Sequence, residues 1–320
     1  MSEKVWVGVD IGGTKTAVVF SSSPPDVLAR KEFPTLPAQG PTRALKMIKA
    51  GIREVLSAQG LTDSALQAIG VSCGSPLDHI AGIIQSPPNL PTWVDVPITS
   101  ILEKEFHAAC HLENDANAGA VAEHRFGAGQ GCQNMLFLTM GTGFGAGLIV
   151  EGRLYHGASD QAGEIGHVRL TRRGPVGYNK AGSVEGWVSG GGLAQVAVRA
   201  VELARKKGKK TLLAAGLKSQ HAITARDVGM AAQHGDALAR QIIQSTGRRL
   251  GEVLAILVDI LNPERIVIGG LAMRLGETLL APARAVVKRE ALAADVCQIV
   301  PATLGEQIGD IAALCVAMGL

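Results

Sequence analysis

Two glycine-rich turns are the segments of this chain best suited to bind phosphate groups. The first covers residues 12–16, and the second covers residues 141–147, with Thr142 near its start. Consecutive backbone N–H groups in such turns make a concave site for anions, and threonine hydroxyls add further donors. Asp10, at the end of the strand before the first turn, could hold a hydrated Mg²⁺ ion. Either turn, taken alone, could equally be an ordinary hairpin turn.

Polar residues in apolar surroundings form a second set of candidates. Asn114 and Asp115 join a strand to a helix. A carboxylate there could take a proton from a substrate hydroxyl, although either residue could simply cap the helix. Glu164 and His167 lie between glycines and could hold a polyol, form a structural pair or, with further ligands, bind a metal. Asn89 lies in a proline-rich loop that could aim it into the same site or be only a rigid turn.

Each glycine-rich turn lies between two predicted β-strands. Residues 5–11 and 17–20 flank the first turn, and residues 135–140 and 148–150 flank the second. Strands joined by a Gly-rich turn form a hairpin, which excludes a P-loop and a Rossmann turn because both need a helix after the glycines. Two related hairpins, each opening one half of the chain, predict an internally duplicated fold with two lobes.

The remaining elements predict the α/β class. Strands alternate with helices after the first hairpin, and the second half is mainly helical. Apolar residues at helical spacing indicate helices over 42–59, 97–106, 116–125, 191–207, 224–234, 236–261 and 307–318. Short apolar runs indicate strands over 68–72, 110–113 and 265–268. The last helix is apolar enough to dock on the body of the protein.

Composition excludes several classes of protein. Of the 320 residues, 47% are hydrophobic and 18% are charged, which allows a sizeable core and excludes wholesale disorder. The 40 glycines follow no collagen period. The net charge of +3 and an aromatic content of 3% give no reason to expect nucleic acid as a partner. The basic run 205–210 is interpreted as a solvated helix end.

The sequence also predicts where the protein is found. The longest apolar stretch, residues 253–261, is too short to span a bilayer, and the N-terminus has no secretory apolar region. The 5 cysteines are far apart and form no C-x-x-C pair, which favours a reducing compartment. We therefore expect a cytoplasmic protein that has no membrane partner.

In their order and spacing these motifs resemble the ROK family of sugar kinases, in the actin-like ATPase superfamily. The matching segments are DIGGTK (10–15, first phosphate motif), PNLPTW (88–93, sugar loop), ENDANA (113–118, catalytic motif), LTMGTGFGAG (138–147, second phosphate motif), GEIGH (163–167, sugar and metal side) and IGG (268–270, adenosine side). The family normally has glycine where Thr92 stands. The resemblance implies a duplicated actin-like ATPase (ribonuclease H-like) fold with two lobes and a central cleft. The smaller lobe would contain residues 1–115 and 305–320, and the larger lobe residues 116–304.

The resemblance also implies a role for each matching residue. Asp115 would be the general base. The sugar would be bound by Gly74, Asn89, Asn114, Glu164, His167 and Glu185. ATP would be bound by Asp10, Gly12, Gly13, Thr14, Lys15, Thr142, Gly143, Gly269 and Gly270, with Asp10 contacting Mg²⁺ through water.

The activity that the resemblance implies is transfer of the γ-phosphoryl group of ATP to the 6-hydroxyl of a hexose. Glucose is the expected sugar, and N-acetylmannosamine, N-acetylglucosamine, fructose and allose are alternatives. The family also contains sugar-responsive transcription repressors, which carry a helix-turn-helix segment before the first phosphate motif. Here that motif begins at Val5, which disfavours a regulator. The resemblance further implies a homodimer.

One segment departs from the family pattern. After the matching histidine, most of the family carries the zinc motif C-x-C-G-x-x-G-C-x-E. Residues 174–185 (GPVGYNKAGSVE) lack all three cysteines, although Gly182 and Glu185 persist. With His167 alone, a four-coordinate zinc site has no ligand set. We therefore expect no structural zinc and a loop held by its own packing, through Tyr178 or Trp187.

Overall fold

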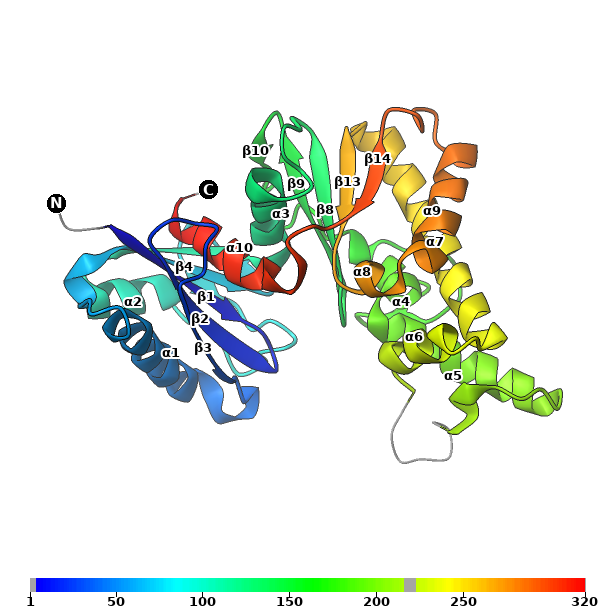
Figure 1. Cartoon of the computed structure of the whole chain (residues 1–320), viewed down its shortest axis with the longest axis horizontal. Coiled ribbons are helices and arrows are strands. Elements are labelled where there is room, and N and C mark those ends of the chain that lie inside the picture. The colour runs from blue at the N-terminus through cyan, green and yellow to red at the C-terminus, as the bar shows by residue number, and fades with distance from the viewer. Residues whose placement is uncertain (1–3, 216–222, 320) are drawn as a thin grey trace. The chain divides into compact units, whose positions relative to one another are not determined.

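The chain forms two compact units. The computed structural model describes residues 4–215 and 223–319 (Figure 1). The first unit contains Met1–Gly131, Gly147–Ala162 and Thr303–Leu320, and the second contains Cys132–Ala146 and Gly163–Ala302.

The first unit is built on a five-stranded sheet of order β3-β2-β1-β4-β7. Its strands are β1 (Val5–Ile11), β2 (Lys15–Ser21), β3 (Ala29–Pro34), β4 (Leu66–Cys73) and β7 (Ala109–Asn114). β1 and β2 form the predicted antiparallel hairpin, whereas β1, β4 and β7 run parallel. The carboxyl ends of the three parallel strands therefore meet at one edge of the sheet.

A second five-stranded sheet repeats this arrangement in the order β10-β9-β8-β13-β14. Its strands are β8 (Met135–Met140), β9 (Phe144–Val150), β10 (Arg153–Leu154), β13 (Arg265–Ile268) and β14 (Gln298–Pro301). In both sheets a hairpin is followed outward by two strands that run parallel to its first strand. The predicted internal duplication is confirmed by this shared strand order.

The predicted helices are present, and the second unit contains three further helices. In the first unit the helices are α1 (Gly40–Ser57), α2 (Ile98–Phe106), α3 (Asp115–Phe126) and α10 (Ile308–Ala317). In the second they are α4 (Val184–Val188), α5 (Gly190–Lys206), α6 (Ala225–Gln233), α7 (Ala237–Leu261), α8 (Leu271–Leu275) and α9 (Glu277–Glu290), of which α4, α8 and α9 are the further ones. Short elements are β5 (Leu77–Asp78), β6 (Ile83–Ile84), β11 (Val176–Gly177), β12 (Lys180–Ala181) and the 3-10 turns η1 (Pro37–Gln39), η2 (Asp63–Ala65), η3 (Ile165–His167), η4 (Leu212–Ala215) and η5 (Gly305–Gln307).

The last helix docks on the first sheet, as its apolar sequence predicted. Gly8 of β1 and Gly70 of β4 are direct partners across the sheet. A β-carbon at Gly70 would overlap backbone atoms of Ala313 and Ala317 in α10. The two glycines therefore let the backbone of α10 lie directly on the sheet, a close approach that a side chain would prevent.

The division into units differs from the boundary expected at residue 115. α3 belongs to the first unit because α10 packs against it. The buried Glu123 of α3 also accepts hydrogen bonds from the backbone N–H groups of Thr303 and Leu304. These contacts join segments distant in sequence, so no local pattern reveals them.

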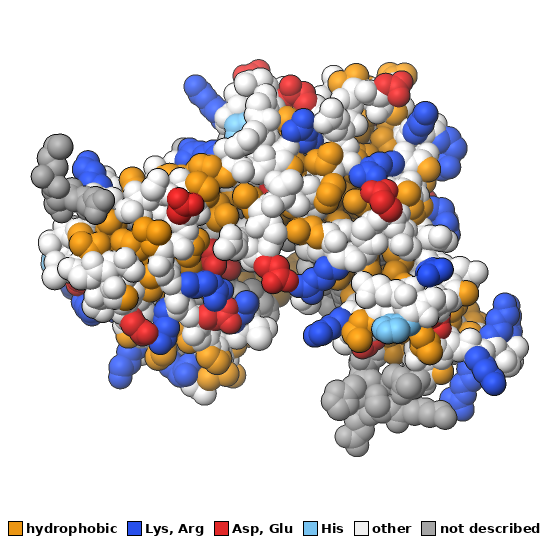
Figure 2. All heavy atoms as spheres, viewed as in Figure 1, with side chains coloured by type: hydrophobic (Ala, Val, Ile, Leu, Met, Phe, Trp, Pro, Cys, Tyr) orange, Lys and Arg blue, Asp and Glu red, His pale blue; other side chains and the backbone are white. Residues whose placement is uncertain are grey.

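The surface agrees with the interpretation of the basic run. Residues 205–210 are exposed at the end of α5 and in the turn after it, which confirms the predicted solvated helix end. Figure 2 shows this group of Lys and Arg side chains at the lower right, and elsewhere on this face basic and acidic side chains are interspersed. Within residues 4–215 and 223–319, every helix is too short or too polar to cross a membrane.

Substitution of Gly70 tests the packing of α10. We expect Gly70→Ala to lower the free energy of unfolding by at least about 2 kcal/mol, because the added methyl group meets backbone that cannot rotate away. The matched control is Gly229→Ala in α6, where the nearest atom is the end of the Leu275 side chain, 3.3 Å from the new β-carbon. Urea unfolding measures both variants. Equal stability of the two would contradict the close packing.

Candidate active site

Polar side chains gather where the parallel strands of the first sheet end. Asp10 of β1 lies opposite Ser72 of β4, and Cys73 of β4 lies opposite Asn114 of β7. Asp115 follows directly as the first residue of α3. The parallel pairing therefore brings Asp10, Asn114 and Asp115 to one edge of the sheet, where α/β proteins commonly bind ligands.

The first predicted phosphate turn closes the β1–β2 hairpin and is anchored from outside by Thr35. The Thr35 hydroxyl donates to the Gly12 carbonyl oxygen at 2.7 Å, and the Thr35 N–H donates to that of Thr14 at 3.1 Å. The side chains of Thr14 and Lys15 are exposed. Lys15 Nζ lies 2.9 Å from a carboxylate oxygen of Glu32. The backbone of the turn is thus fixed while the Thr14 hydroxyl faces solvent.

Three of the predicted sugar-binding residues lie together beside this turn. A β-carbon on Gly13 would lie 2.8 Å from Cβ of Asn89, and one on Gly74 would lie 3.4 Å from Asn89 Oδ1. Asn114 Nδ2 donates to the hydroxyl of Ser75 at 2.7 Å. The proline-rich loop therefore does aim Asn89 toward the phosphate turn, and Gly74 and Asn114 complete the group.

The sequence left open whether Asn114 and Asp115 cap the helix or face a substrate, and the structure shows a different role for each. The Asn114 side chain caps α3, accepting from the N–H groups of Ala116 at 2.9 Å and Asn117 at 3.2 Å. Asp115 accepts from the Ala116 N–H at 2.8 Å and keeps an exposed side chain. The cap consumes the amide oxygen of Asn114, whereas the carboxylate of Asp115 is open to a substrate.

Asp10 lies near the acidic residues Asp115 and Asp310 of the first unit. A β-carbon on Gly309 would lie 2.5 Å from Asp10 Oδ2, so α10 begins directly against Asp10. Burial, and then the negative charges of Asp115 and Asp310, raise the pKa of Asp10 from 3.8 to about 7. The protein atoms packed around Asp115 also raise its pKa, although the side chain reaches solvent. The hydrogen bond from the Ala116 N–H lowers the pKa by a smaller amount. A carboxylate oxygen is the kind of ligand that Mg²⁺ prefers, and the contact of Asp10 with hydrated Mg²⁺ stays a prediction.

The predicted sugar-side residues of the second unit gather around the start of β9. Glu185 of α4 accepts a hydrogen bond from the Phe144 N–H at 3.2 Å. Gly166 lies between Glu164 and His167, and a β-carbon there would overlap the Phe144 carbonyl oxygen and lie 3.5 Å from Cβ of Glu185. The segment carrying Glu164 and His167 therefore packs against the strand end that Glu185 also contacts. The side chains of Glu164 and His167 are exposed.

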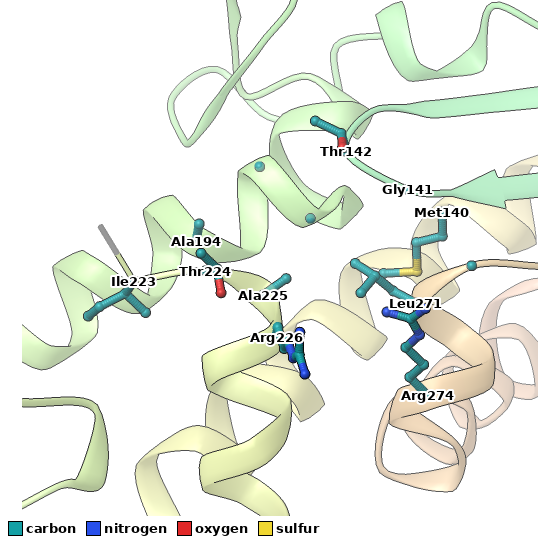
Figure 3. Close-up of a pocket in the computed structure, with 13 residues that line it drawn as sticks. Met140, Gly141, Thr142, Ala194, Ile223, Thr224, Ala225, Arg226, Leu271 and Arg274 are labelled. Carbon is teal, nitrogen blue, oxygen red and sulfur yellow. The ribbon is translucent and has the colours of Figure 1, made fainter. Parts of the chain in front are cut away.

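The second unit also holds a pocket of about 610 Å³ next to the second phosphate turn (Figure 3). Thr142 and Gly270, both predicted to bind nucleotide, belong to it. The lining residues are Met140, Gly141, Thr142, Gly190, Gly191, Ala194, Ile223, Thr224, Ala225, Arg226, Gly270, Leu271 and Arg274. A pocket of this volume can hold a small organic ligand.

Two predicted nucleotide-side glycines contact other parts of the protein. A β-carbon on Gly143 would lie 2.9 Å from a carboxylate oxygen of Glu185. One on Gly269 would lie 3.0 Å from the ring of Phe137 in β8. Their absent side chains permit this packing, and their contact with ATP stays a prediction.

The start of α5 is a part of the pocket that no sequence motif predicted. The Gly190 N–H donates to the Gly141 carbonyl oxygen at 2.8 Å, and the Gly191 N–H to that of Thr142 at 3.3 Å. Ser189 caps the helix with its side chain. The signal was a serine followed by glycines at the start of a helical pattern. These bonds, and that of the Gly192 N–H to the Ser189 hydroxyl at 3.0 Å, use the first N–H groups of α5, so the helix offers an anion beside the turn its dipole and not free donors.

Sequence analysis also missed two arginines of the pocket. Figure 3 shows Arg226 of α6 and Arg274 of α8 at the end of the pocket away from Thr142. The residues are far apart in the chain and neither belongs to a recognised motif. A capping box between Thr224 and Asp227 fixes the start of α6, and with it the position of Arg226.

Comparisons with known proteins identify the family. A sequence profile of the ROK family matches residues 6–319. The glucokinase of Halalkalibacterium halodurans is 34% identical over 313 residues, which cover 97% of this chain and 93% of that protein. The chain belongs to the ROK family.

Within the ROK family the chain is similar to both enzymes and regulators. A ROK family glucokinase from Streptomyces griseus, solved in complex with glucose and AMPPNP, has a TM-score of 0.82 and 29% identity, covering 98% of this chain and 99% of that chain. The fold is therefore the actin-like ATPase fold that the sequence implied. The xylose repressor of Caldicellulosiruptor bescii is 27% identical over 289 residues, covering 90% of this chain and 71% of that protein. The site, more than membership of the ROK family, must decide the function.

The segment that replaces the ROK zinc motif folds as a small hairpin. β11 and β12 pair, and Tyr178 and Asn179 turn between them with φ of 47° and 60°. Such a two-residue turn suits the twist of the strands. The indole N–H of Trp187 donates to the Thr171 hydroxyl at 2.7 Å, and Tyr178 meets the ring of His167 edge-on at 5.2 Å. Both aromatic residues expected to hold the loop do contact its surroundings.

The side chains around this hairpin do not form a metal-binding group. Among residues 4–215 and 223–319, no three His, Cys, Asp or Glu side chains lie together in a way that could hold a metal ion. The ring of His167 contacts Tyr178 instead.

The raised pKa of Asp10 predicts a pH dependence of stability. The folded protein keeps the Asp10 proton up to about pH 7, whereas the unfolded chain releases it near 3.8. Folding therefore binds a proton in this window, and stability falls as pH rises through it. The Asp10→Asn variant lacks this titration. Its stability relative to wild type should rise by up to about 4 kcal/mol between pH 4 and pH 7.

Urea unfolding at several pH values measures this difference. The control is Asp95→Asn, an exposed aspartate of the same unit. A difference between Asp10→Asn and wild type that stays constant from pH 4 to pH 7 would contradict the raised pKa.

Proposed function

We propose that this chain is an ATP-dependent sugar kinase that phosphorylates the 6-hydroxyl of a hexose, with glucose as the preferred sugar. The observation that carries the proposal is the exposed carboxylate of Asp115 at the start of α3, in one group with Asn89, Asn114 and the first phosphate turn. The similarity to glucokinases supports glucose.

Asp115 acts as the general base. As the sugar oxygen attacks the γ-phosphorus atom, its proton passes to the carboxylate of Asp115 and the bond to the leaving oxygen of ADP breaks. The dense surroundings raise the pKa of Asp115, which makes the carboxylate a better proton acceptor. Phosphoryl transfer otherwise depends on positioning and on stabilisation of negative charge.

Backbone N–H groups of the two turns stabilise that charge. Thr35 fixes the first turn, and the start of α5 packs on the second, so their donors are oriented before ATP binds. Asp10 would hold the Mg²⁺ ion that accompanies ATP, which when bound supplies positive charge at the phosphates.

The pocket of the second unit binds the nucleoside part of ATP. Thr142 and the start of α5 lie at one end, which suits the phosphates, and Arg226 and Arg274 lie at the other (Figure 3). A planar guanidinium group stacks well on an aromatic ring, so the arginines face the adenine base. Gly141 and Gly270 leave the wall of the pocket without side chains.

Two sets of side chains are candidates for contacts with the sugar, amides in the first unit and charged side chains in the second. Asn89 and Asn114 are in the first set, and Glu164, His167 and Glu185 are in the second. Carboxylates accept hydrogen bonds from hydroxyl groups, and amides both donate and accept. The β11–β12 hairpin contacts His167 through Tyr178, so it bears on the choice between glucose and the N-acetylhexosamines.

A sugar-responsive regulator is the second candidate function. The similarity to a xylose repressor is the observation that favours it. A regulator needs sugar binding but has no use for a general base. Turnover of ATP in the presence of a hexose, measured beside binding to DNA fragments, separates the two functions.

Substitution of Asp115 tests the catalytic role. We expect Asp115→Asn to lower kcat by about 100-fold or more, because the amide cannot accept the proton. Sugar binding, followed by calorimetry, should persist, since the amide keeps the size of the side chain. Asp95→Asn is the control, and kcat near the wild-type value in Asp115→Asn would refute the assignment.

A panel of sugars tests the substrate. We expect the highest kcat/KM for glucose when the wild-type protein is assayed with glucose, fructose, allose, N-acetylglucosamine and N-acetylmannosamine. Phosphorus NMR of the product locates the phosphate, which should be on the 6-hydroxyl. A preferred N-acetylhexosamine would overturn the choice of glucose, and turnover of none of the sugars would overturn the kinase.

Metal analysis tests the expected absence of zinc. The purified protein should contain far less than one zinc per chain, because the β11–β12 hairpin has no cysteine ligands. Treatment with EDTA should leave its melting temperature unchanged, since the hairpin is held by hydrogen bonds and packing. Stoichiometric zinc, or a large loss of stability in EDTA, would contradict this expectation.

A further inference from the structure

Four ionisable side chains of the first unit form a continuous array next to the catalytic segment. His156 Nε2 lies 2.7 Å from Glu113 Oε2, and His79 Nδ1 lies 2.7 Å from Asp160 Oδ2. The two imidazole rings are stacked, with centroids 4.0 Å apart and planes 3° from parallel. The order of contacts is therefore Asp160, His79, His156 and Glu113.

Glu113 connects this array to the first turn of α3. Its Oε1 atom accepts hydrogen bonds from the Asn114 N–H at 2.8 Å and from Asn117 Nδ2 at 2.9 Å. Asn114 in turn caps the helix that begins with Asp115. One carboxylate thus holds the residue before the proposed base and a residue one half-turn after it.

The buried carboxylate of Glu113 needs His156 as a hydrogen-bond partner. Only 1% of the Glu113 side chain is exposed, and a buried carboxylate is costly unless each oxygen has a partner. The backbone and Asn117 satisfy Oε1, and His156 is the partner of Oε2. The histidine, which is 23% exposed, closes this group from the solvent side.

The ring of His79 holds the ring of His156 in place. His79 follows β5 and His156 follows β10, so the stack joins two loops from separate parts of the chain. Asp160 stabilises this pair of loops because its Oδ2 atom accepts a hydrogen bond from the His79 backbone N–H at 3.1 Å. A ring fixed on one face by another ring has little freedom to turn away from Glu113.

We propose that His156 is a positioning residue for phosphoryl transfer, which orients Asp115 through Glu113 and is itself held by the His79–Asp160 pair. The proposal rests on the kinase function proposed above. His156 contacts Glu113, so its effect on the reaction passes through Glu113 and the first turn of α3. A shift of the base of about 1 Å is enough to slow such a reaction strongly.

The charges around His156 favour its protonated form. Glu113 faces it from β7, Asp160 from the loop after β10, and His79 stacks on it from the loop after β5. The hydrogen bond to Glu113 raises the pKa of His156 above 6.5. The charged pair is therefore complete below that raised pKa and weakens as the pH rises through it.

Three variants test the proposal in the full-length protein. His156→Ala should lower kcat by about 10- to 100-fold with little change in the KM for ATP or in sugar affinity, because only the position of the base is disturbed. His156→Gln, whose amide N–H can still reach Glu113, should restore most of kcat. His111→Ala, at an exposed histidine of the same strand as Glu113, is the control and should match wild type.

The pH profile of kcat distinguishes positioning from a general loss of stability. The ratio of kcat for wild type to that for His156→Gln should fall as the pH rises through the pKa of His156, because only wild type loses a charged partner of Glu113. Melting temperatures of the variants show whether each is folded at the assay temperature.

The outcomes separate this inference from the proposed function. Wild type that phosphorylates no hexose overturns both. Active wild type with unchanged kcat in a folded His156→Ala variant overturns the positioning role alone. A fall in sugar affinity equal to the fall in kcat, or no recovery in His156→Gln, also overturns it, because those results indicate damage to the site as a whole.

Discussion

The parallel pairing of β1, β4 and β7 is the constraint on which the proposed chemistry of the first unit depends. Because the three strands run the same way, Asp10 lies at the same edge of the sheet as Asn114 and Asp115, from which about a hundred residues separate it in the chain. The close packing of α10 on Gly8 and Gly70 then brings Gly309 and Asp310 against Asp10. The raised pKa of Asp10 is a consequence of this arrangement.

The second unit contains a sheet of the same strand arrangement, but the residues at its edge form a different kind of site. Its hairpin also presents a glycine-rich turn, but α5 begins beside that turn and supplies a helix N-terminus. The pocket next to it is lined largely by small residues, with two arginines at one end. Duplication of one fold has thus produced one unit with a group of carboxylates and another with a nucleotide-sized pocket.

The hairpin formed by β11 and β12 is held by contacts of its own side chains and of those around it. A two-residue turn with positive φ, an indole hydrogen bond to Thr171 and an aromatic contact to His167 hold the segment. Arg249 also lies over the Trp187 ring, 4.8 Å from its centre. These contacts are the basis of the expectation that the hairpin folds without zinc.

The sequence by itself determined the fold class, the duplication, the family and the residues of each motif. Local signals were sufficient for these because strand and helix periods, glycine turns and motif spacing are written in consecutive residues. The strands of both hairpins and the long helices were predicted within a few residues of their observed ends. α9 was missed, since Pro282 inside it mimics a helix break, while burial of Leu279, Leu280 and Val286 offsets the lost hydrogen bond.

Only the tertiary structure decided which of these residues act together. The carboxylates around Asp10, the arginines of the pocket and the stacked histidines beside Glu113 come from elements far apart in the chain. The boundary of the first unit likewise depends on α10 and on the bonds of Glu123 to Thr303 and Leu304. Each of these features arises from packing between distant segments. Local sequence patterns carry no information about such contacts, because they reflect only the conformational preferences of neighbouring residues.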